Sequence, residues 1–113
     1  MQRISSHVLD TTLGKPAAGI DIVLFKHNGD EWIEISQGTT DNDGRVGNFL
    51  NDNLGLETAR YRLRFSLEAY FALQQQPCFY PQVEIECRLQ AEDDHYHIPL
   101  LISPFGYSTY RGS

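Results

Sequence analysis

The chain is poor in the residue types that mark several large protein classes. It has two cysteines, Cys78 and Cys87, in 113 residues, and their spacing neither forces a disulfide nor forms a zinc knuckle, so we expect free thiols. Lys and Arg number 9 against 15 Asp and Glu, which gives a net charge of -6. This balance disfavours binding to nucleic acid or to anionic membranes, because both need clustered positive charge.

Long apolar runs are also missing. No segment approaches the roughly 18 apolar residues that a membrane-spanning helix needs, and the opening Met-Gln-Arg-Ile-Ser-Ser has no apolar signal-peptide region. A length of 113 residues, 41% of them hydrophobic, suits one domain with a sizeable core. We therefore expect a single domain over 1–113, located in the cytoplasm and without a membrane partner.

The pattern that is present is a period of two. Apolar and polar residues alternate over 60–67 and again over 83–90, which is typical of half-buried strands. Two further strands, over 20–26 and 31–37, flank His27-Asn28-Gly29-Asp30. The Asn-Gly pair in this turn is a strong hairpin signal, so the two strands are expected to pair.

The sequence predicts one helix, and it is short. Residues 68–75 combine good helix formers and end before Pro77, which cannot continue a helix. The segment 51–58 is a polar loop, and the chain has no internal repeat. Roughly eight regularly spaced strands with one helix predict an all-β, antiparallel β-sandwich.

Separated motifs along the chain indicate a known family. They are His7-Val8-Leu9-Asp10-Thr11-Thr12-Leu13-Gly14-Lys15-Pro16-Ala17-Ala18-Gly19-Ile20, Thr40-Asp41-Asn42-Asp43-Gly44-Arg45, Phe79-Tyr80-Pro81 and the ending Tyr110-Arg111-Gly112-Ser113. In this order they resemble the transthyretin-like family. The Tyr-Arg-Gly-Ser ending is similar to that of the family's 5-hydroxyisourate hydrolase branch and separates it from the hormone-carrying transthyretins.

The resemblance implies both a fold and an activity. The fold would be the prealbumin-like sandwich of two four-stranded sheets with one short helix, assembled as a homotetramer whose edge strands pair across subunits. The activity would be that of a hydrolase of purine metabolism without a cofactor. Its small-molecule substrate, 5-hydroxyisourate, would be converted to 2-oxo-4-hydroxy-4-carboxy-5-ureidoimidazoline in urate degradation.

The resemblance also assigns roles to single residues. It places His7, Arg45 and His97 in catalysis, and it gives substrate binding to the tail residues Tyr110, Arg111, Gly112 and Ser113. A neutral imidazole suits proton transfer near pH 7, and a guanidinium suits the carbonyl oxygens of a flat heterocycle. Which histidine is the base stays open. His95 has no counterpart in the resemblance and is expected to face solvent.

Two metal interpretations are weaker. His95 and His97 with His7 could hold zinc, but no further ligand of the right type and spacing accompanies them. The run Asp41-Asn42-Asp43-Gly44 is superficially similar to a calcium loop, yet it would put Thr39 and Leu50 where carboxylates are required. We therefore expect a turn at 41–44, and no metal or cofactor.

Two non-enzymatic alternatives stay open. A transthyretin-like carrier would bind a small aromatic ligand in a central channel, and an adhesion or carbohydrate-binding sandwich would use scattered polar residues. A carrier has no use for His7, Arg45, His97 and the tail together, so this combination favours the hydrolase.

Overall fold

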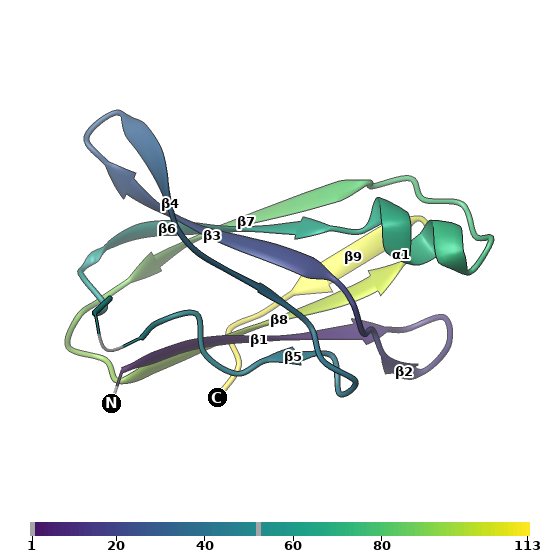
Figure 1. The fold of residues 1–113 in the computed structure, drawn as a ribbon, viewed down its shortest axis with the longest axis horizontal. Helices are drawn as coiled ribbons and strands as arrows, with labels where there is room; N and C mark the ends of the chain where they lie inside the picture. Colours follow the sequence, from purple (N-terminus) through teal and green to yellow (C-terminus); the bar gives the residue numbers. More distant parts are fainter. Residues whose placement is uncertain (1, 52) are drawn as a thin grey trace.

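The computed structural model describes residues 2–51 and 53–113 and contains two packed β-sheets (Figure 1). The elements are β1 (Arg3–Asp10), β2 (Lys15–Pro16), β3 (Asp21–Asn28), β4 (Glu31–Thr39), β5 (Arg45–Val46), β6 (Ala59–Ser66), α1 (Glu68–Leu73), β7 (Gln82–Leu89), β8 (His95–Ser103) and β9 (Gly106–Thr109). The predicted all-β sandwich with one short helix is confirmed. Of the predicted loop 51–58, Asp52 lies outside the described residues.

The two sheets differ in regularity. One has four strands in the order β4-β3-β6-β7, and the other has the order β2-β1-β8-β9 with β5 also paired to β1. This second sheet therefore counts five strands instead of four, because the two-residue strands β2 and β5 share one edge of β1. In Figure 1 the sheet that contains β3, β6 and β7 forms the upper layer, and β1, β5 and β8 lie below it.

One strand pair departs from the antiparallel pattern. β1 and β8 run parallel, in a register that places Ser5 opposite His97 and His7 opposite Pro99. Parallel neighbours need a long crossover connection, and here the whole four-stranded sheet lies between them in the sequence. β1, near the start of the chain, is thereby paired along its full length with β8, near the end.

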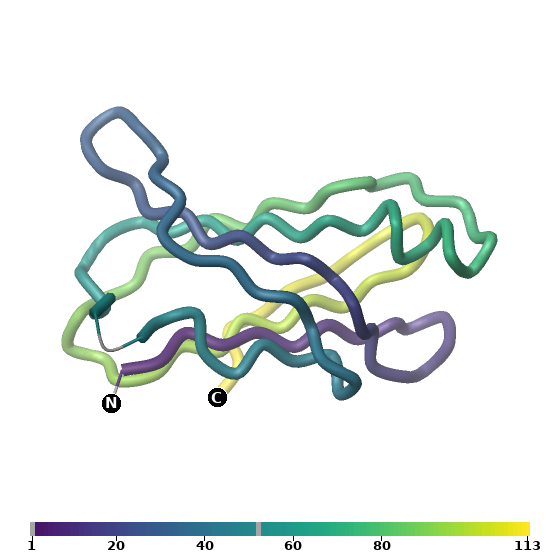
Figure 2. The backbone as a smooth tube through the Cα atoms, viewed as in Figure 1, coloured from purple at the N-terminus to yellow at the C-terminus, as the bar shows by residue number. Residues whose placement is uncertain are grey.

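The predicted hairpin is present and projects from the body of the sandwich, where Figure 2 shows it in blue. β3 and β4 are both longer than expected, and only Gly29 and Asp30 separate them. Gly29 adopts a φ of 66°, which is the left-handed conformation that such a tight turn requires. A register shift between Leu24 and Phe25 accompanies the bend of this hairpin.

The apolar side chains of the alternation predicted over 60–67 lie on β6 and fill the core. Tyr61, Leu63 and Phe65 of β6 are fully or almost fully buried between the sheets. On β7, Ile85 and Cys87 are only half-buried, because β7 is an edge strand. Burial raises the pKa of the Cys87 thiol to about 11, so this thiol stays protonated at neutral pH.

The helix is two residues shorter than predicted and is tied to the far sheet. Gln75 takes a positive φ of 56° after the last turn and ends the helix ahead of Pro77. Phe71 is buried, and the Tyr70 hydroxyl donates a 2.7 Å hydrogen bond to Oδ2 of the buried Asp10 on β1. This contact fixes the end of β1 that leads into β2.

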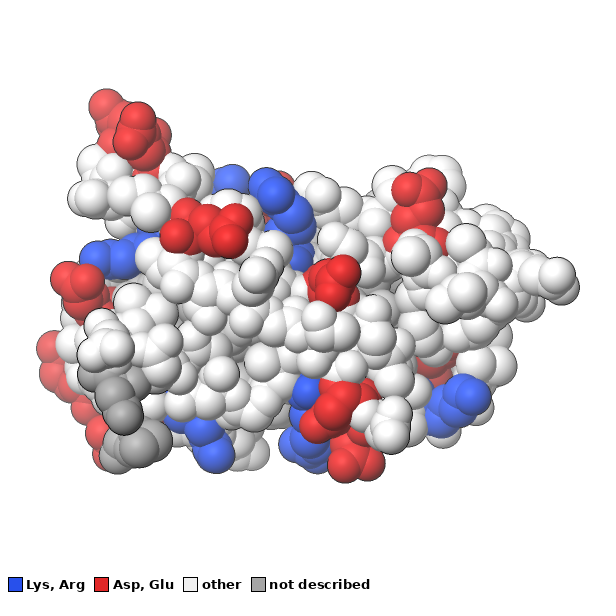
Figure 3. Space-filling model, viewed as in Figure 1, with Lys and Arg blue, Asp and Glu red and all other residues white. Residues whose placement is uncertain are grey.

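Charges of both signs are interspersed on the surface. On the face shown in Figure 3, acidic groups outnumber basic ones and the basic groups form no continuous patch there. Within the described part of the chain, no helix has the length and apolar character to cross a membrane.

Candidate active site

The sequence-predicted catalytic side chains meet on the outer face of the β1–β8 sheet. Ile4 and Val8 of β1 point into the core, so the alternating residues Arg3, Ser5 and His7 point outward. The parallel register sets Ser5 beside His97, and His7 pairs with Arg45 of β5 on its other side. Residues from the start, middle and end of the sequence therefore share one surface.

The turn before β5 brings Arg45 to this surface. Asp41 Oδ1 accepts hydrogen bonds from the backbone N–H groups of Asp43 at 2.9 Å and Arg45 at 3.0 Å. Gly44 has a φ of 75°, and a Cβ there would lie 2.4 Å from the Val8 carbonyl oxygen, so only glycine lets the turn approach β1. The run 41–44 is thus the predicted turn.

A polar cleft of about 340 Å³ opens at the junction of these strands. Its lining residues are Arg3, Ser5, Ser6, Arg45, Val46, Gly47, His95, His97 and Ser113. His7 adjoins the cleft, with its ring centroid 6.4 Å from that of His97. The lining contains two arginines and no carboxylate side chain, so the cleft is cationic although the protein is acidic overall.

His95, expected from the sequence to face solvent, is half-buried. His95 lines the cleft, and its Nε2 lies 3.2 Å from the Ser5 hydroxyl oxygen. The same hydroxyl lies 2.8 Å from Nδ1 of His97. The period of two that separates the histidines also places them on one face, beside the serine of the neighbouring strand.

His97 is held in the neutral form. Burial lowers its pKa below the usual 6.5, and the positive charge of Arg45 lowers it further, followed by His7, His95 and Arg3. A neutral imidazole at physiological pH has one free nitrogen that can accept a proton. His97 is therefore equipped to act as a base in this cleft.

The last residues of the chain close one side of the cleft. The Gly112 N–H donates a 2.8 Å hydrogen bond to the His97 carbonyl, and Ser113 lines the cleft. A Cβ on Gly112 would lie 2.6 Å from Cδ2 of His97, so the glycine is what allows the tail to lie against the ring. The Thr109 hydroxyl donates to the Pro99 carbonyl at 2.7 Å and holds the preceding part of the tail.

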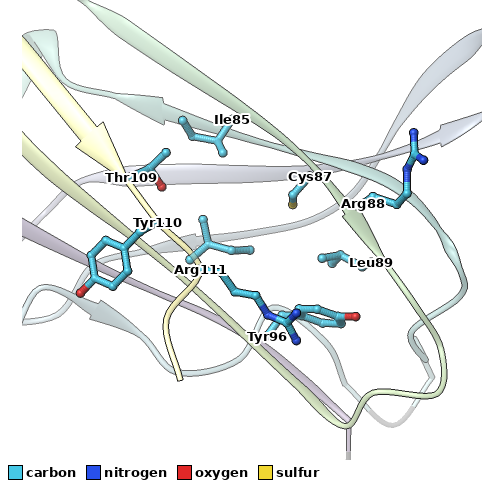
Figure 4. A pocket seen from close by; sticks show the side chains of 9 residues that line it. Ile85, Cys87, Arg88, Leu89, Tyr96, Thr109, Tyr110 and Arg111 are labelled. Atoms are coloured by element: carbon cyan, nitrogen blue, oxygen red, sulfur yellow. The ribbon is translucent and has the colours of Figure 1, made fainter.

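Tyr110 and Arg111 do not line this cleft in the single chain. Both border a second, mainly apolar pocket of about 250 Å³ between β7 and the tail. In Figure 4 the Tyr110 ring points away from that pocket, whereas Arg111 reaches toward Tyr96. The Arg111 guanidinium carbon lies 4.9 Å from the Tyr96 ring centroid, and its Nη2 lies 4.0 Å from Asp93. Arg111 is thus placed to anchor the tail from the opposite face of the sheet.

Metal-ligating side chains are not clustered in the described part of the chain. Among residues 2–51 and 53–113, no group of three or more His, Cys, Asp or Glu side chains is arranged to hold a metal ion. Hydrogen bonds within the turn occupy the Asp41 carboxylate oxygen that faces it. The arrangement of imidazoles and guanidiniums in the cleft instead suits proton transfer and the binding of an electron-rich, planar molecule.

Sequence reasoning missed Arg3 and Ser5. Arg3 and Ser5 lie four and two residues before His7, so the period-two alternation of a strand places them on the same face as His7. Their relevance depends on the parallel pairing with β8, which the sequence did not predict.

The fold and the cleft together define a prealbumin-like β-sandwich with a histidine- and arginine-lined site on one sheet. The sequence profile of the HIUase/Transthyretin family matches residues 4–112. The chain belongs to this family. It is 43% identical over 115 residues to 5-hydroxyisourate hydrolase 2 of Rhizobium meliloti, a match that covers 98% of this chain and 96% of that one.

Solved structures from both branches of the family resemble this chain. The 5-hydroxyisourate hydrolase of Klebsiella pneumoniae has a TM-score of 0.85 and 32% identity, with all of both chains covered. Sea bream transthyretin in complex with thyroxine has a TM-score of 0.90 and 28% identity, over 97% of this chain and 94% of that one. Since both structures share the fold, the fold alone does not separate the hydrolase from the thyroxine-binding transthyretin.

Proposed function

We propose that this protein hydrolyses 5-hydroxyisourate to 2-oxo-4-hydroxy-4-carboxy-5-ureidoimidazoline, a step of urate degradation. The observation that carries the proposal is the meeting of His7, His97 and Arg45 on one face of a single sheet, beside the cleft that Ser113 lines. Its relatives named as hydrolases, including one that is 43% identical over nearly the whole chain, support the same activity.

The chemistry requires only acid-base groups and oxyanion stabilisation. A water oxygen bonds to the lactam carbonyl carbon, the carbon–nitrogen bond of the six-membered ring breaks, and the carbonyl carbon becomes the carboxyl group of the product. One histidine takes the proton from water, and the leaving nitrogen receives a proton in return. Arg45 and Arg3 offer positive charge to the oxyanion that forms as water adds.

The tail would bind and orient the substrate. Ser113 and the backbone of Gly112 lie beside His97, within reach of a molecule in the cleft. Tyr110 is 59% exposed and lies on the outer side of the tail, so it is available to a cleft on another subunit. Arg111 would act by anchoring the tail, because its side chain stacks on Tyr96.

The proposal includes a cytoplasmic homotetramer. β7 and β9 are edge strands of the two sheets, and edges with unpaired backbone groups favour pairing with another chain. Exposed aromatic side chains lie around the β9 hairpin, namely Phe79, Tyr80, Phe105, Tyr107 and Tyr110. Exposed aromatic clusters of this kind are enriched at protein interfaces.

A carrier of a small aromatic ligand is the second candidate, since the sea bream transthyretin with thyroxine has the same fold. The test is to generate 5-hydroxyisourate in situ from urate and urate oxidase and to follow its ultraviolet absorbance. Added protein should accelerate the decay, and a His97→Asn variant purified in the same way should not. Decay at the uncatalysed rate, together with tight binding of an aromatic ligand, would favour the carrier.

A further inference from the structure

The Ser5 hydroxyl sits between two imidazole rings that the parallel register brings to it. Its oxygen lies 2.8 Å from Nδ1 of His97 and 3.2 Å from Nε2 of His95, and Ser5 is only 7% exposed. His95 and His97 are two residues apart on β8, and both face Ser5 from the neighbouring strand.

A hydroxyl carries one hydrogen, so Ser5 can donate to one ring only and must accept from the other. If it donates to His97 Nδ1, the proton of the neutral His97 ring is on Nε2, and that nitrogen can only donate. If it accepts from His97 Nδ1–H, the Nε2 atom has a free lone pair and can act as a base. The second arrangement has Ser5 donating to Nε2 of His95.

We propose that Ser5 is a positioning residue that keeps the His97 proton on Nδ1 and thereby makes Nε2 of His97 the general base of the cleft. This inference rests on the hydrolytic function proposed above and assigns the base, which the sequence left open between His7 and His97. Histidines that work as acids or bases commonly have their tautomer fixed by a hydrogen bond to the second ring nitrogen. Here a serine between two histidines makes that hydrogen bond.

The surroundings of His97 are compatible with a neutral ring whose tautomer is selected by a hydrogen bond. The charged or titratable side chains that face it are Arg3 and His7 on β1, Arg45 on β5 and His95 on β8. The residues lining the cleft include no acidic side chain that could hold Nδ1–H in place of Ser5.

The first experiment measures the tautomer directly in the unmodified protein. Nitrogen-15 NMR of histidine-labelled protein at neutral pH should show His97 with a protonated Nδ1 and an unprotonated Nε2. A proton on Nε2 instead would overturn the proposal. This measurement needs no substrate. It therefore tests the tautomer of His97 even if the protein proves not to hydrolyse 5-hydroxyisourate.

The second experiment uses variants of Ser5. Ser5→Ala should shift His97 toward a mixture of tautomers and lower kcat roughly 10- to 100-fold, the scale found for partners that orient a functional histidine. KM should change much less, because Ser5 acts through His97. Ser5→Thr keeps the hydroxyl and should restore both the tautomer and most of kcat.

The matched control is Thr11→Ala. The Thr11 hydroxyl donates to the Ile102 carbonyl of β8 at 3.0 Å and does not line the cleft, so its loss should leave the His97 tautomer and kcat unchanged. The proposal is overturned if Ser5→Ala keeps the native tautomer, or if Ser5→Thr is as slow as Ser5→Ala. Should Ser5→Ala fail to fold, the tautomer in the unmodified protein and the Ser5→Thr rate still decide the question.

Discussion

At the scale of single residues, the cleft concentrates positive charge in an acidic protein. Arg3 and Arg45 line it together with two histidines, while the whole chain has a net charge of -6. This charge disfavours protonation of His97 and at the same time favours negative charge on a bound molecule. The same side chains thus favour a neutral His97 and, in the proposed reaction, would stabilise the oxyanion.

Replacing His7 or His97, the proposed acid-base groups, should remove activity without unfolding the protein. We expect His7→Asn and His97→Asn each to lower kcat/KM by about 10²-fold or more, the scale of a lost acid-base group. Both side chains are partly exposed, so the melting temperature should change little. The control is His27→Asn, because His27 contacts Arg60 and Trp32 on the other sheet. Equal losses in all three variants would contradict the assignment.

Arg45 should set the pH range of the reaction as well as its rate. The neutral form of His97 is the active one, so activity falls as the pH drops through its pKa, which burial and then Arg45 lower below 6.5. Arg45→Gln removes a positive charge, and the pKa should rise toward its usual value. The acidic limb of the kcat/KM profile should therefore move to higher pH.

Lys26→Gln is the control for this shift, because Lys26 pairs with Glu57 away from the cleft. Its profile should coincide with that of the unmodified protein. An acidic limb that stays in place in Arg45→Gln, or moves to lower pH, would show that His97 does not govern it.

At the scale of elements, the tail is held by contacts on two sides. The Gly112 backbone pairs with His97 and Ser113 lies at the cleft, while the Arg111 guanidinium stacks on Tyr96. The tail is therefore held by a backbone hydrogen bond on one side and a cation–π contact on the other. A chain end, which commonly frays, is thus fixed against the His97 ring.

Gly112→Ala should disturb the site selectively. The new Cβ would lie 2.6 Å from Cδ2 of His97, so the tail or the ring must shift. We expect a fall in kcat/KM of at least about tenfold, since displacements near 1 Å can cost this much or more, with a small change in melting temperature. Gly106→Ala is the control, because the nearest atom to its Cβ is 3.7 Å away. Equal activities of the two variants would contradict the role of the tail.

At the scale of the whole molecule, one architecture serves an enzyme and a carrier. The sea bream transthyretin matches this chain with a TM-score of 0.90 and the Klebsiella pneumoniae hydrolase with 0.85, so the backbone alone does not separate the two functions. Function depends on the side chains of a site and not on the fold, so we expect the distinction on the outer face of the β1–β8 sheet.

The purified protein should be a tetramer. Edge strands β7 and β9 and the exposed aromatic residues near Tyr107 favour association between copies. Light scattering coupled to size-exclusion chromatography should give four times the mass of one chain, and dilution that dissociates the tetramer should reduce activity. A stable and fully active monomer would show that each cleft works alone.

The amino-acid sequence by itself determined the class of fold and most of the site. Period-two alternation specifies half-buried strands such as β6 whatever their partners, because side chains alternate between core and solvent. The Asn-Gly pair fixed the β3–β4 hairpin, and Pro77 limited the helix, since both act through local backbone geometry. The motif residues His7, Arg45 and His97 were found from resemblance alone.

Only the tertiary structure decided which side chains share the cleft. The parallel pairing of β1 with β8 joins segments from opposite ends of the sequence, and no local signal specifies that register. It brought Ser5 between His95 and His97 and placed His95 at the cleft. The contact of Arg111 with Tyr96, outside the cleft, likewise depends on how the tail folds back against β8. Contacts between distant segments depend on how strands pair and how the two sheets pack. The pattern of residues within any one strand does not determine either.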